Sequence, residues 1–462
     1  MTARRLNNDF VASLDGFLPA GEAHELVAAL SDTEPTVSVR LNTGKGGAPA
    51  SGVARVPWCP PGMYLDERAA FTFDPHFHAG RYYVQDASSM FFYHVIKQLV
   101  KAPVAYLDLC AAPGGKTTTA IDALPAGSLV VANEVVPQRA LALRDNVARW
   151  GYPGTVVTRA MPAAIGTLGP LFDVVAADVP CSGEGMMRKD EEAARQWSPA
   201  LVAQCAERQR GIVADIWPAL KPGGLLIYST CTFNRHENEE ILDLLIDTLG
   251  AEPVAVETPH EWGIAGGIDT PHPCHHFFPH RTRGEGLFVA VVRKPAGAVA
   301  PQRASKGGGK TPPFPQAMEW LSNPEQFAMR LKDDTIYAIP RGWEPLILLI
   351  EKKIPVLAMG VETATVKGRK IMPAHGLALS TALRADAFPT RGVDYATALA
   401  FLRGESFVVE APRGPVLLAY EGSPLGFVNN LGNRANNLYP KPLRILNAHN
   451  PSTPPQVIIP NH

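Results

Sequence analysis

The stretch VAYLDLCAAPGGKTTTAIDAL, residues 104–124, joins a short apolar run, a glycine-containing turn and a helix-like segment. Glycines at a strand-to-helix turn let a ligand approach the backbone, and the first turn of a helix offers unpaired N–H groups. The same order recurs along the chain, with further apolar runs at 128–135, 154–160, 172–178, 223–230 and 286–292. This alternation predicts an α/β fold with a parallel sheet covered on both faces, whose ligands bind beyond the carboxyl ends of the strands.

Composition divides the chain into three parts and a linker. Residues 294–315, KPAGAVAPQRASKGGGKTPPFP, lack periodic apolar positions and are typical of a linker. Residues 101–293 contain the predicted parallel sheet. Residues 1–100 form a smaller α/β segment, with a helical pattern over 20–30 and a strand-like run over 36–43.

The part after the linker, residues 316–462, has a different pattern. It begins with a helix predicted over 316–330 and continues with short apolar runs typical of strands. The predicted strands are 356–360, 406–410, 416–422 and 425–430. We therefore expect a mostly β C-terminal module.

Composition also bounds the class of protein. No apolar run approaches the roughly 18 to 20 residues that span a bilayer, and the start, MTARRLNNDF, lacks the apolar stretch of a secretion signal. We expect a cytoplasmic protein without a membrane partner. The six cysteines show no regular pairing pattern, which predicts free thiols that are available for chemistry.

Charge is unevenly divided along the chain. The formal net charge is −1, but residues 303–462 contain 18 Lys and Arg against 12 Asp and Glu. The C-terminal part is therefore the basic part. A surplus of this size points only weakly to nucleic acid, because solvated surface charge is the commoner reason.

Glu134 suggests what the glycine turn could bind. It closes the second apolar run, about 20 residues after the turn, where an acidic side chain can accept hydrogen bonds from ribose hydroxyls. The turn does not match the full Gly-x-x-x-x-Gly-Lys-Ser/Thr pattern of a phosphate-binding loop, because Cys110 occupies the place of its first glycine. These features favour an adenosine-containing ligand, and S-adenosylmethionine fits them as well as a dinucleotide does.

Two cysteines follow neighbouring predicted strands. Cys181 comes three residues after Asp178, and Cys231 closes the run 223–230. A single free cysteine is usually a small packing residue, but two at strand ends indicate chemistry. Methylation of cytosine at carbon 5 needs such a thiolate, because addition to carbon 6 makes carbon 5 nucleophilic. An acid such as Asp178 would stabilise the charge that develops on the ring.

Four motifs in order resemble the Nop/Sun family of RNA cytosine-5 methyltransferases: YYVQDASSM, CAAPGGKT, ADVPCSGEGM and YSTCT, starting at residues 82, 110, 177 and 228. The resemblance implies a Rossmann-like S-adenosylmethionine methyltransferase domain. It further implies that Cys231 is the nucleophile and that Cys181 assists release of the product. Glu134 and Asp178 would contact the cofactor together with the glycine segment Cys110, Ala111, Ala112, Pro113, Gly114, Gly115 and Lys116.

One position departs from the family pattern. The family usually has Asn or Asp after its third strand to meet the adenine edge, and Arg159 occupies that place here. We keep Arg159 among the cofactor candidates as the residue aligned there.

The resemblance extends outside the predicted methyltransferase domain. PTVSVRLNT at 35–43, KGRKIMPAHGLAL at 367–379 and LGFVNNLGNRANNLYPKPLRIL at 425–446 resemble the RsmF-type members. These members modify small-subunit ribosomal RNA, so the resemblance implies that 16S ribosomal RNA in the small ribosomal subunit is the substrate. It also implies a PUA-like, RNA-binding C-terminal module.

Several further side chains are candidates for RNA contacts. Lys and Arg residues could meet phosphates around the target base or in the tail, although any one of them could equally be a solvated charge. These are Arg188, Lys189, Arg281, Arg283, Lys367, Arg369, Lys370, Arg434, Lys441 and Arg444. Phe233 and Trp197 could stack on an unstacked cytosine, but we expect both in the core. The cluster HPCHHFFPH at 272–280 lacks metal-ligand spacing, so we expect no metal site.

Together these features predict a monomeric RNA methyltransferase that uses S-adenosylmethionine. Two alternatives stay open. The substrate could be transfer RNA, since the catalytic motifs are shared between subfamilies. The chain could also be a non-catalytic ribosome-assembly factor that binds RNA, although such a scaffold would have no need of both thiols.

Overall fold

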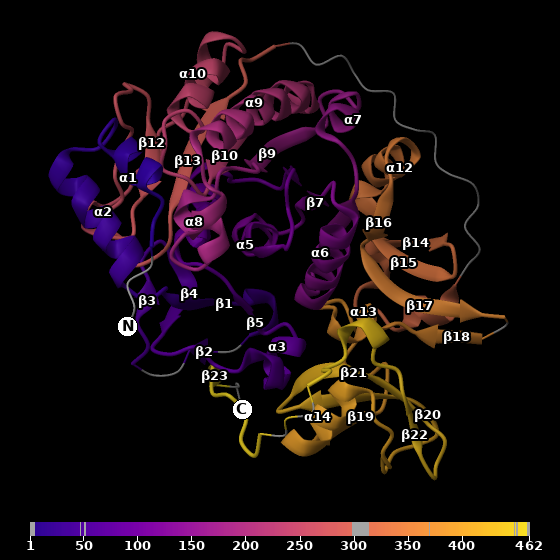
Figure 1. The fold of residues 1–462 in the computed structure, drawn as a ribbon. Coiled ribbons are helices and arrows are strands. Elements are labelled where there is room, and N and C mark those ends of the chain that lie inside the picture. The colour runs from indigo at the N-terminus through magenta and orange to yellow at the C-terminus, as the bar shows by residue number, and fades with distance from the viewer. Residues whose placement is uncertain are drawn as a thin grey trace.

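The computed structural model describes residues 5–46, 48–49, 52–297, 314–368, 370–447, 449 and 451–459. Its largest sheet runs in the order β11-β13-β10-β9-β6-β7-β8-β16, with β12 paired to β13 (Figure 1). Every apolar run expected to form the parallel sheet is a strand: β6 (Ala105–Asp108), β7 (Leu129–Asn133), β8 (Thr155–Thr158), β9 (Phe172–Asp178), β10 (Leu220–Thr230) and β13 (Leu287–Arg293). The strands from β8 to β10 are mutually parallel and β13 is antiparallel, which confirms the Rossmann-like prediction.

Helices cover both faces of this sheet. On one face, side chains such as Leu107 and Leu226 share a core with α7 (Pro162–Gly166), α9 (Pro199–Ile216) and α10 (Glu239–Asp247). On the other face, Tyr106 and Ile227 pack with α4 (Phe91–Leu99) and α5 (Gly115–Ala123).

Helix α9 illustrates why these segments are helical. Ser198 caps it by accepting a hydrogen bond from the Leu201 amide, and Pro199 occupies the first turn, where its missing N–H costs nothing. Its buried residues recur at helical spacing toward the sheet; they are Val202, Cys205, Ala206, Gln209, Val213 and Ile216.

The N-terminal segment forms its own antiparallel sheet. Helices α1 (Asn8–Leu14) and α2 (Ala20–Asp32) precede a sheet in the order β3-β4-β1-β5, with bounds Arg55–Val56, Cys59–Leu65, Val37–Leu41 and Tyr82–Val84. The predicted helix over 20–30 and strand over 36–43 are both confirmed. Arg40 is fully buried and ties the sheet to α5, where its guanidinium contacts Asp122 and donates 2.6 Å to Thr118 Oγ1.

The C-terminal part contains two further sheets. One is ordered β14-β15-β17-β18 and the other β19-β20-β21-β22, with helices α13 and α14 beside the second (Figure 1). Their bounds are β14 (Phe327–Lys332), β15 (Thr335–Pro340), β17 (Val361–Lys367), β18 (Lys370–Pro373), α13 (His375–Leu379), β19 (Thr390–Val393), α14 (Tyr395–Arg403), β20 (Gly414–Tyr420), β21 (Ser423–Asn430) and β22 (Ala435–Asn437).

Two local predictions in this part are wrong. The helix expected over 316–330 ends at Glu319, because Leu321 forms a β-bridge with Leu383. It does not resume, because Asn323 takes a left-handed conformation with φ 54° and Pro324 follows it. The strand expected over 406–410 makes a single bridge, between Phe407 and Ala435. The Asn430 side chain instead binds the carbonyls of this stretch, donating 3.2 Å to Val409 O and 2.7 Å to Ala411 O.

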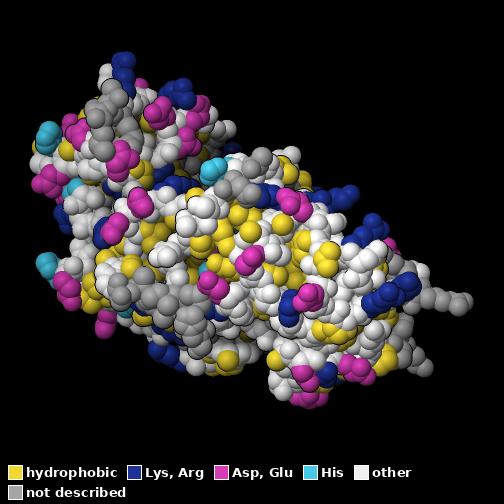
Figure 2. Space-filling view, turned by 90° about the horizontal axis from the view of Figure 1, so that it is seen from below, with side chains coloured by type: hydrophobic (Ala, Val, Ile, Leu, Met, Phe, Trp, Pro, Cys, Tyr) yellow, Lys and Arg dark blue, Asp and Glu magenta, His cyan; other side chains and the backbone are white. Residues whose placement is uncertain are grey.

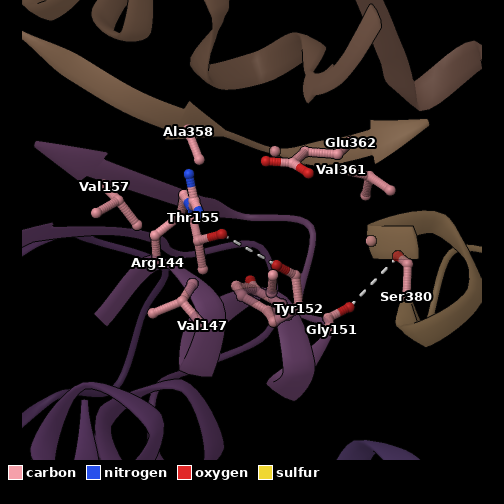
Figure 3. Close-up of a pocket in the computed structure, with 13 residues that line it drawn as sticks. Arg144, Val147, Gly151, Tyr152, Thr155, Val157, Ala358, Val361, Glu362 and Ser380 are labelled. Atoms are coloured by element: carbon pink, nitrogen blue, oxygen red, sulfur yellow. Dashed lines mark hydrogen bonds between the residues drawn. The ribbon is translucent and has the colours of Figure 1, made fainter. Parts of the chain in front are cut away.

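The strand predicted over 356–360 exists but joins an unexpected sheet. As β16 (Val356–Met359) it pairs antiparallel with β8, so a strand from beyond the predicted linker extends the methyltransferase sheet. Gly360 continues the contact through its amide, which donates 2.7 Å to Thr155 O. Figure 3 shows the contact between these two parts of the chain, with Ala358 and Glu362 facing Val157 and Arg144. Of the predicted linker 294–315, residues 298–313 lie outside the described residues.

The surface carries both signs of charge. In the view from below, Lys and Arg side chains stand along the right-hand margin, where the C-terminal part lies, and acidic side chains gather on the upper-left lobe (Figure 2). Within the part of the chain that the structure describes, no helix has both the length and the apolarity needed to cross a membrane.

Candidate active site

The glycine segment lies between the end of β6 and the start of α5, as the sequence predicts. Neighbouring groups hold its backbone: the Ala111 amide donates 2.8 Å to Asn133 O, and Arg139 donates 2.9 Å to Ala112 O. Asn146 of helix α6 (Pro137–Trp150) donates 2.7 Å to Pro113 O. Gly114 has φ 114°, in the region that glycine populates readily. The segment is therefore a preformed turn at the edge where ligands of such sheets bind.

Two buried carboxylates beside this turn each have one oxygen that accepts no hydrogen bond. Asp108 Oδ2 accepts 2.6 Å from Thr117, whereas its Oδ1 has no hydrogen-bond partner. Burial raises the pKa of Asp108 to about 7. Glu134 Oε1 accepts 2.9 Å from the Val136 amide, and its Oε2 has only Arg139 nearby, at 3.5 Å.

These unpaired acceptors test whether a nucleoside cofactor fits. A buried acceptor without a donor is costly, and the hydroxyl groups of a ribose are donors that would satisfy Glu134 at the tip of β7. The unpaired carboxylate oxygens beside the turn therefore fit the ribose of S-adenosylmethionine. Sequence reasoning placed Glu134 among the contacts but gave no role to Asp108, although an acid at the end of a buried strand is the same signal.

The ends of β9 and β10 bring the two predicted cysteines together. Cys181 Sγ and Cys231 Sγ lie 3.1 Å apart, and the Cys231 amide donates 3.3 Å to Cys181 Sγ. The hydrogen bond with Cys231 and burial raise the pKa of Cys181 well above its ordinary value. Cys181 therefore stays a protonated thiol that can donate to the Cys231 sulfur.

Asp178 lies beside this pair and is tied to the glycine turn. Lys116 Nζ donates 2.9 Å to Asp178 Oδ2, and Ser229 donates 2.6 Å to Asp178 Oδ1. Burial opposes the charge on Lys116, but Asp178 outweighs it and the neighbouring Cys231 adds to the effect, so the pKa of Lys116 is raised. The ammonium thus stays charged near the Cys231 sulfur.

A buried polar network links the two cysteine loops, and sequence reasoning missed it. Glu184 Oε2 accepts from the amides of Phe233 and Asn234 at 2.6 and 3.0 Å. Its other oxygen accepts 3.0 Å from Trp197 Nε1. The Gly185 amide donates 2.9 Å to Cys231 O. The Glu-Gly pair directly after Cys-Ser-Gly was the available signal.

The candidates for phosphate contact near the site divide into two groups. Arg188 is 5% exposed and binds Glu285 through two hydrogen bonds of 2.9 Å, so it is a structural residue and the phosphate role is wrong. Arg281 pairs with Glu22 at 2.6 Å. Lys189 stays partly exposed, with its nearest carboxylates at 3.6 and 3.7 Å. Lys189 therefore keeps a cation at the surface beside the Pro-Cys loop.

The remaining candidates are spread over the molecule. Arg283 lies over the Tyr64 ring, and Arg159 is exposed at the end of β8, where its amide donates 3.0 Å to Pro355 O. Lys370, Arg434 and Lys441 are exposed and Arg444 is half-buried. Arg369 and the side chain of Lys367 lie outside the described residues.

The aromatic residues and the histidine cluster belong to the core. Phe233 is fully buried and stacks on Phe278, while Trp197 packs edge-on against Phe10, which confirms the expected core packing. His276 is buried against Glu239, at 2.8 Å. Over the described ranges, no group of three His, Cys, Asp or Glu side chains could hold a metal ion.

Three parts of the chain match known families. Residues 100–293 match the family described as 16S rRNA methyltransferase RsmB/F. Residues 6–87 match the N-terminal domain of 16S rRNA methyltransferase RsmF, and residues 389–445 match the methyltransferase RsmF PUA domain.

Relatives and solved structures agree with these matches. Ribosomal RNA small subunit methyltransferase F of Enterobacter sp. is 30% identical over 468 residues, which cover 94% of this chain and 95% of the relative. The protein of the same name from Erwinia tasmaniensis is 29% identical, covering 94% and 96%. The fold resembles that of NSun6 from Pyrococcus horikoshii with SFG, with a TM-score of 0.53 at 18% identity over 63% of this chain and 99% of that one. The chain therefore belongs to the ribosomal RNA small subunit methyltransferase F family, the RsmF type of the Nop/Sun methyltransferases.

Proposed function

We propose that this chain methylates carbon 5 of a cytosine in 16S ribosomal RNA, using S-adenosylmethionine and a covalent adduct with Cys231. The observation that carries the proposal is the 3.1 Å contact between Cys181 and Cys231, next to Asp178 at the end of the sheet. The small ribosomal subunit is the proposed partner. The proposed site of action is the cytoplasm, with the protein acting as a monomer.

Cys231 is the proposed nucleophile because an ammonium and a second thiol lie beside its sulfur at the end of β10. Lys116 supplies a nearby ammonium, and Cys181 supplies a thiol hydrogen bond. The Cys231 sulfur forms a bond to carbon 6 of the cytosine, and the electron pair of the 5,6 double bond becomes available at carbon 5. After methylation a water molecule accepts the proton of carbon 5, the electron pair of that C–H bond reforms the 5,6 double bond, and the Cys231 sulfur leaves as a thiolate with the electrons of its bond to carbon 6.

Cys181 is the proposed assistant in that last step. Its raised pKa makes it a weak nucleophile, but it lies within hydrogen-bond distance of the sulfur that must leave. A thiol at this distance can hold or return a proton during release.

Asp178 is the proposed contact to the cytosine ring. Its carboxylate is 29% exposed on the side chain, so a ring entering the site can reach it, and Ser229 and Lys116 fix its orientation. A carboxylate accepts from the amino group of cytosine, and its positioned charge acts on the ring as addition proceeds.

The cofactor would be held by the glycine turn, Glu134 and Asp108. When bound there, S-adenosylmethionine supplies an electrophilic methyl group. The turn residues bind through backbone groups, and Glu134 orients the ribose. Because the reacting base must be unstacked to reach strand ends, single-stranded or loop RNA is the proposed form of the target.

The test is transfer of labelled methyl groups from S-adenosylmethionine to small subunits that lack the modification, followed by bisulfite mapping of the 16S ribosomal RNA. We expect label on cytosine and a protected position in the map. Transfer RNA serves as the parallel substrate. Label on transfer RNA alone would overturn the ribosomal assignment, and binding without label would favour a non-catalytic assembly factor.

A further inference from the structure

A second pocket lies away from the cysteines, between the N-terminal segment and the C-terminal part. Its volume is about 210 Å³. One wall comes from residues around β5 and the turn after β1, namely Gly44, Lys45, Ala79 and Arg81. The other wall comes from residues 378–381 after α13 and from Gly422 and Pro424 at the turn into β21. Segments far apart in sequence therefore build this pocket.

Arg81 brings a guanidinium to the pocket. Among the described residues, no group accepts a hydrogen bond from this guanidinium. Its Nε is buried without an acceptor, and its other nitrogens donate to no described atom. No described carboxylate lies within 4 Å of it. Burial lowers the pKa of Arg81 from its ordinary value. A half-buried charge without a partner is costly, and an anion would offset that cost.

Two further cations stand close to Arg81. Lys45 Nζ donates 2.8 Å to Ala79 O and 2.6 Å to Arg149 O, which leaves its positive charge without a carboxylate. Burial, then Arg149 and Arg81, lower the pKa of Lys45 well below its ordinary value. Arg149 stacks over Phe77 and donates to the neutral Asn146 side chain. Among the described residues, the three cations thus form a positive cluster without an ion-pair partner.

The nearest acidic residue on the opposite wall is already engaged. Glu421 precedes Gly422 and pairs with His76 at 3.1 Å. Its side chain is 47% exposed, so solvent screens what remains of its charge. The pocket therefore keeps a net positive field.

The wall opposite Arg81 is fixed before any ligand arrives. The Thr381 amide and hydroxyl both donate to Gly151 O, at 3.0 and 3.1 Å. Ser380 donates 3.4 Å to the same carbonyl, as the dashed line in Figure 3 shows. This carbonyl belongs to the end of α6, whose Asn146 also holds the glycine turn. The pocket is consequently preorganised on the same helix as the proposed cofactor site.

We propose that Arg81 and Lys45 bind a phosphate group of the RNA backbone in this pocket. A planar guanidinium matches two phosphate oxygens, and a phosphate bound there would favour the charged form of Lys45, whose pKa burial lowers. The proposal rests on the proposed RNA substrate. It deepens that function by assigning an RNA contact between the N-terminal sheet and the matched PUA residues 389–445, which include Gly422 and Pro424.

The position of Arg81 links this contact to the active site. Arg81 precedes β5, and Gln85 follows it with its side-chain amide 3.0 Å from Thr119 Oγ1 of α5. Four residues of extended chain span roughly 13 Å. Arg81 therefore lies at one end of a strand whose other end contacts α5, the helix that begins in the glycine turn.

The test is RNA binding by Arg81→Gln, measured with 16S ribosomal RNA by fluorescence anisotropy over a series of salt concentrations and without cofactor. We expect roughly tenfold weaker binding, the scale of one hydrogen bond to a charged group. The slope of log affinity against log salt should fall in magnitude by about 0.7 to 1, the value for one lost phosphate contact. Arg81→Lys, which keeps the charge, should keep most of the slope.

Arg384→Gln is the matched control, since Arg384 is exposed and already paired with Asp386 at 2.7 Å. It should leave both affinity and slope unchanged. Thermal unfolding of each variant separates a contact from a folding defect: weaker binding by Arg81→Gln with an unchanged slope would mean a structural role and overturn the proposal.

A measurement with inorganic phosphate alone tests whether the pocket binds free phosphate instead of a phosphate of the RNA backbone. If phosphate stabilises the wild-type protein but not Arg81→Gln, while RNA affinity and slope are equal in both, the pocket binds free phosphate and the RNA assignment is wrong. RNA binding is measured here without cofactor and without methyl transfer. Failure of the Arg81 proposal and failure of the proposed methylation would therefore appear in separate experiments.

Discussion

Glu184 Oε2 accepts a hydrogen bond of 2.6 Å from the amide of Phe233, two residues beyond Cys231. Glu184 itself follows Cys181 by three residues, so one carboxylate joins the loop of each thiol. It is 1% exposed, and amide, indole and side-chain N–H groups satisfy its charge without a cation within ion-pair distance among the described residues. The spacing of the two sulfurs therefore depends on this buried acceptor.

Glu184→Gln should slow methylation by one to two orders of magnitude and destabilise the fold by roughly 3 kcal/mol, because an amide nitrogen would face N–H donors. Turnover, cofactor affinity and chemical unfolding are the measurements. Glu192→Gln, at an exposed position of α8 (Glu191–Gln196), is the control and should change none of them. Equal turnover of the two variants would show that Glu184 does not position the thiols.

Cys231→Ala should abolish methyl transfer, because the neighbouring Cys181 has a pKa raised well above its ordinary value and stays a protonated, weakly nucleophilic thiol. Cys181→Ala should accumulate a covalent protein–RNA adduct that migrates slowly on a denaturing gel, since the thiol that assists release is missing. The double variant supplies the control and should show no adduct. An adduct that requires Cys181 and persists without Cys231 would reverse the two roles.

Lys116→Met should reduce turnover about a hundredfold, the usual scale for loss of one positioned electrostatic group. It should also destabilise the fold, because Asp178 would keep a partly buried charge without its partner. Adding Asp178→Asn removes that charge, so the double variant should be more stable than the sum of the single effects by about 1 to 2 kcal/mol. Additive effects in this double-mutant cycle would contradict the coupling.

Asp108 should make stability fall as pH rises. Burial raises its pKa from 3.8 to about 7, so the folded state binds more protons than the unfolded state between these values. Its protonated form is therefore favoured at pH 4, and that advantage is lost by pH 7, on the order of 4 kcal/mol. Asp108→Asn should lack this pH-dependent contribution to the free energy of unfolding. The free energies of unfolding of wild type and variant, measured at each pH, should diverge from about 4 to 7, and parallel curves would show that burial does not shift this carboxyl.

Gly360→Ala should loosen the C-terminal part from the sheet. Gly360 has φ 60°, and a Cβ there would lie 2.1 Å from Ala338 O. The strain should cost about 1 to 3 kcal/mol in the free energy of unfolding. Gly342→Ala is the matched control, since a Cβ at Gly342 meets nothing within 4 Å. Thermal unfolding and limited proteolysis after the linker would report the difference.

The sequence predicted what depends on local pattern. Apolar runs followed by glycine turns placed the parallel strands, and Cys181 and Cys231 could be assigned to neighbouring strand ends because parallel strands finish at one edge. Side-chain pairings between distant segments left no such pattern. The partner of Arg188 is Glu285, 97 residues away, and nothing in either stretch predicts that the pair is buried.

The same limit applies to β16. Its residues read correctly as a strand, but the choice of sheet depends on which edge is open in three dimensions, and the free edge of β8 was not visible from composition. The helix expected over 316–330 failed partly for a local reason that could have been weighed, since the Asn323–Pro324 dipeptide prevents it from continuing. Its end at Glu319 depends on the bridge between Leu321 and the distant Leu383, which the sequence did not indicate.

The pairing of β8 with β16 has a practical consequence for anyone who dissects this enzyme. A fragment cut at the linker would leave the hydrogen-bonding groups of β8 bare, and such an edge recruits strands from other molecules. During synthesis on the ribosome, that edge stays uncovered until some two hundred further residues have emerged, which is a window in which a chaperone would be useful.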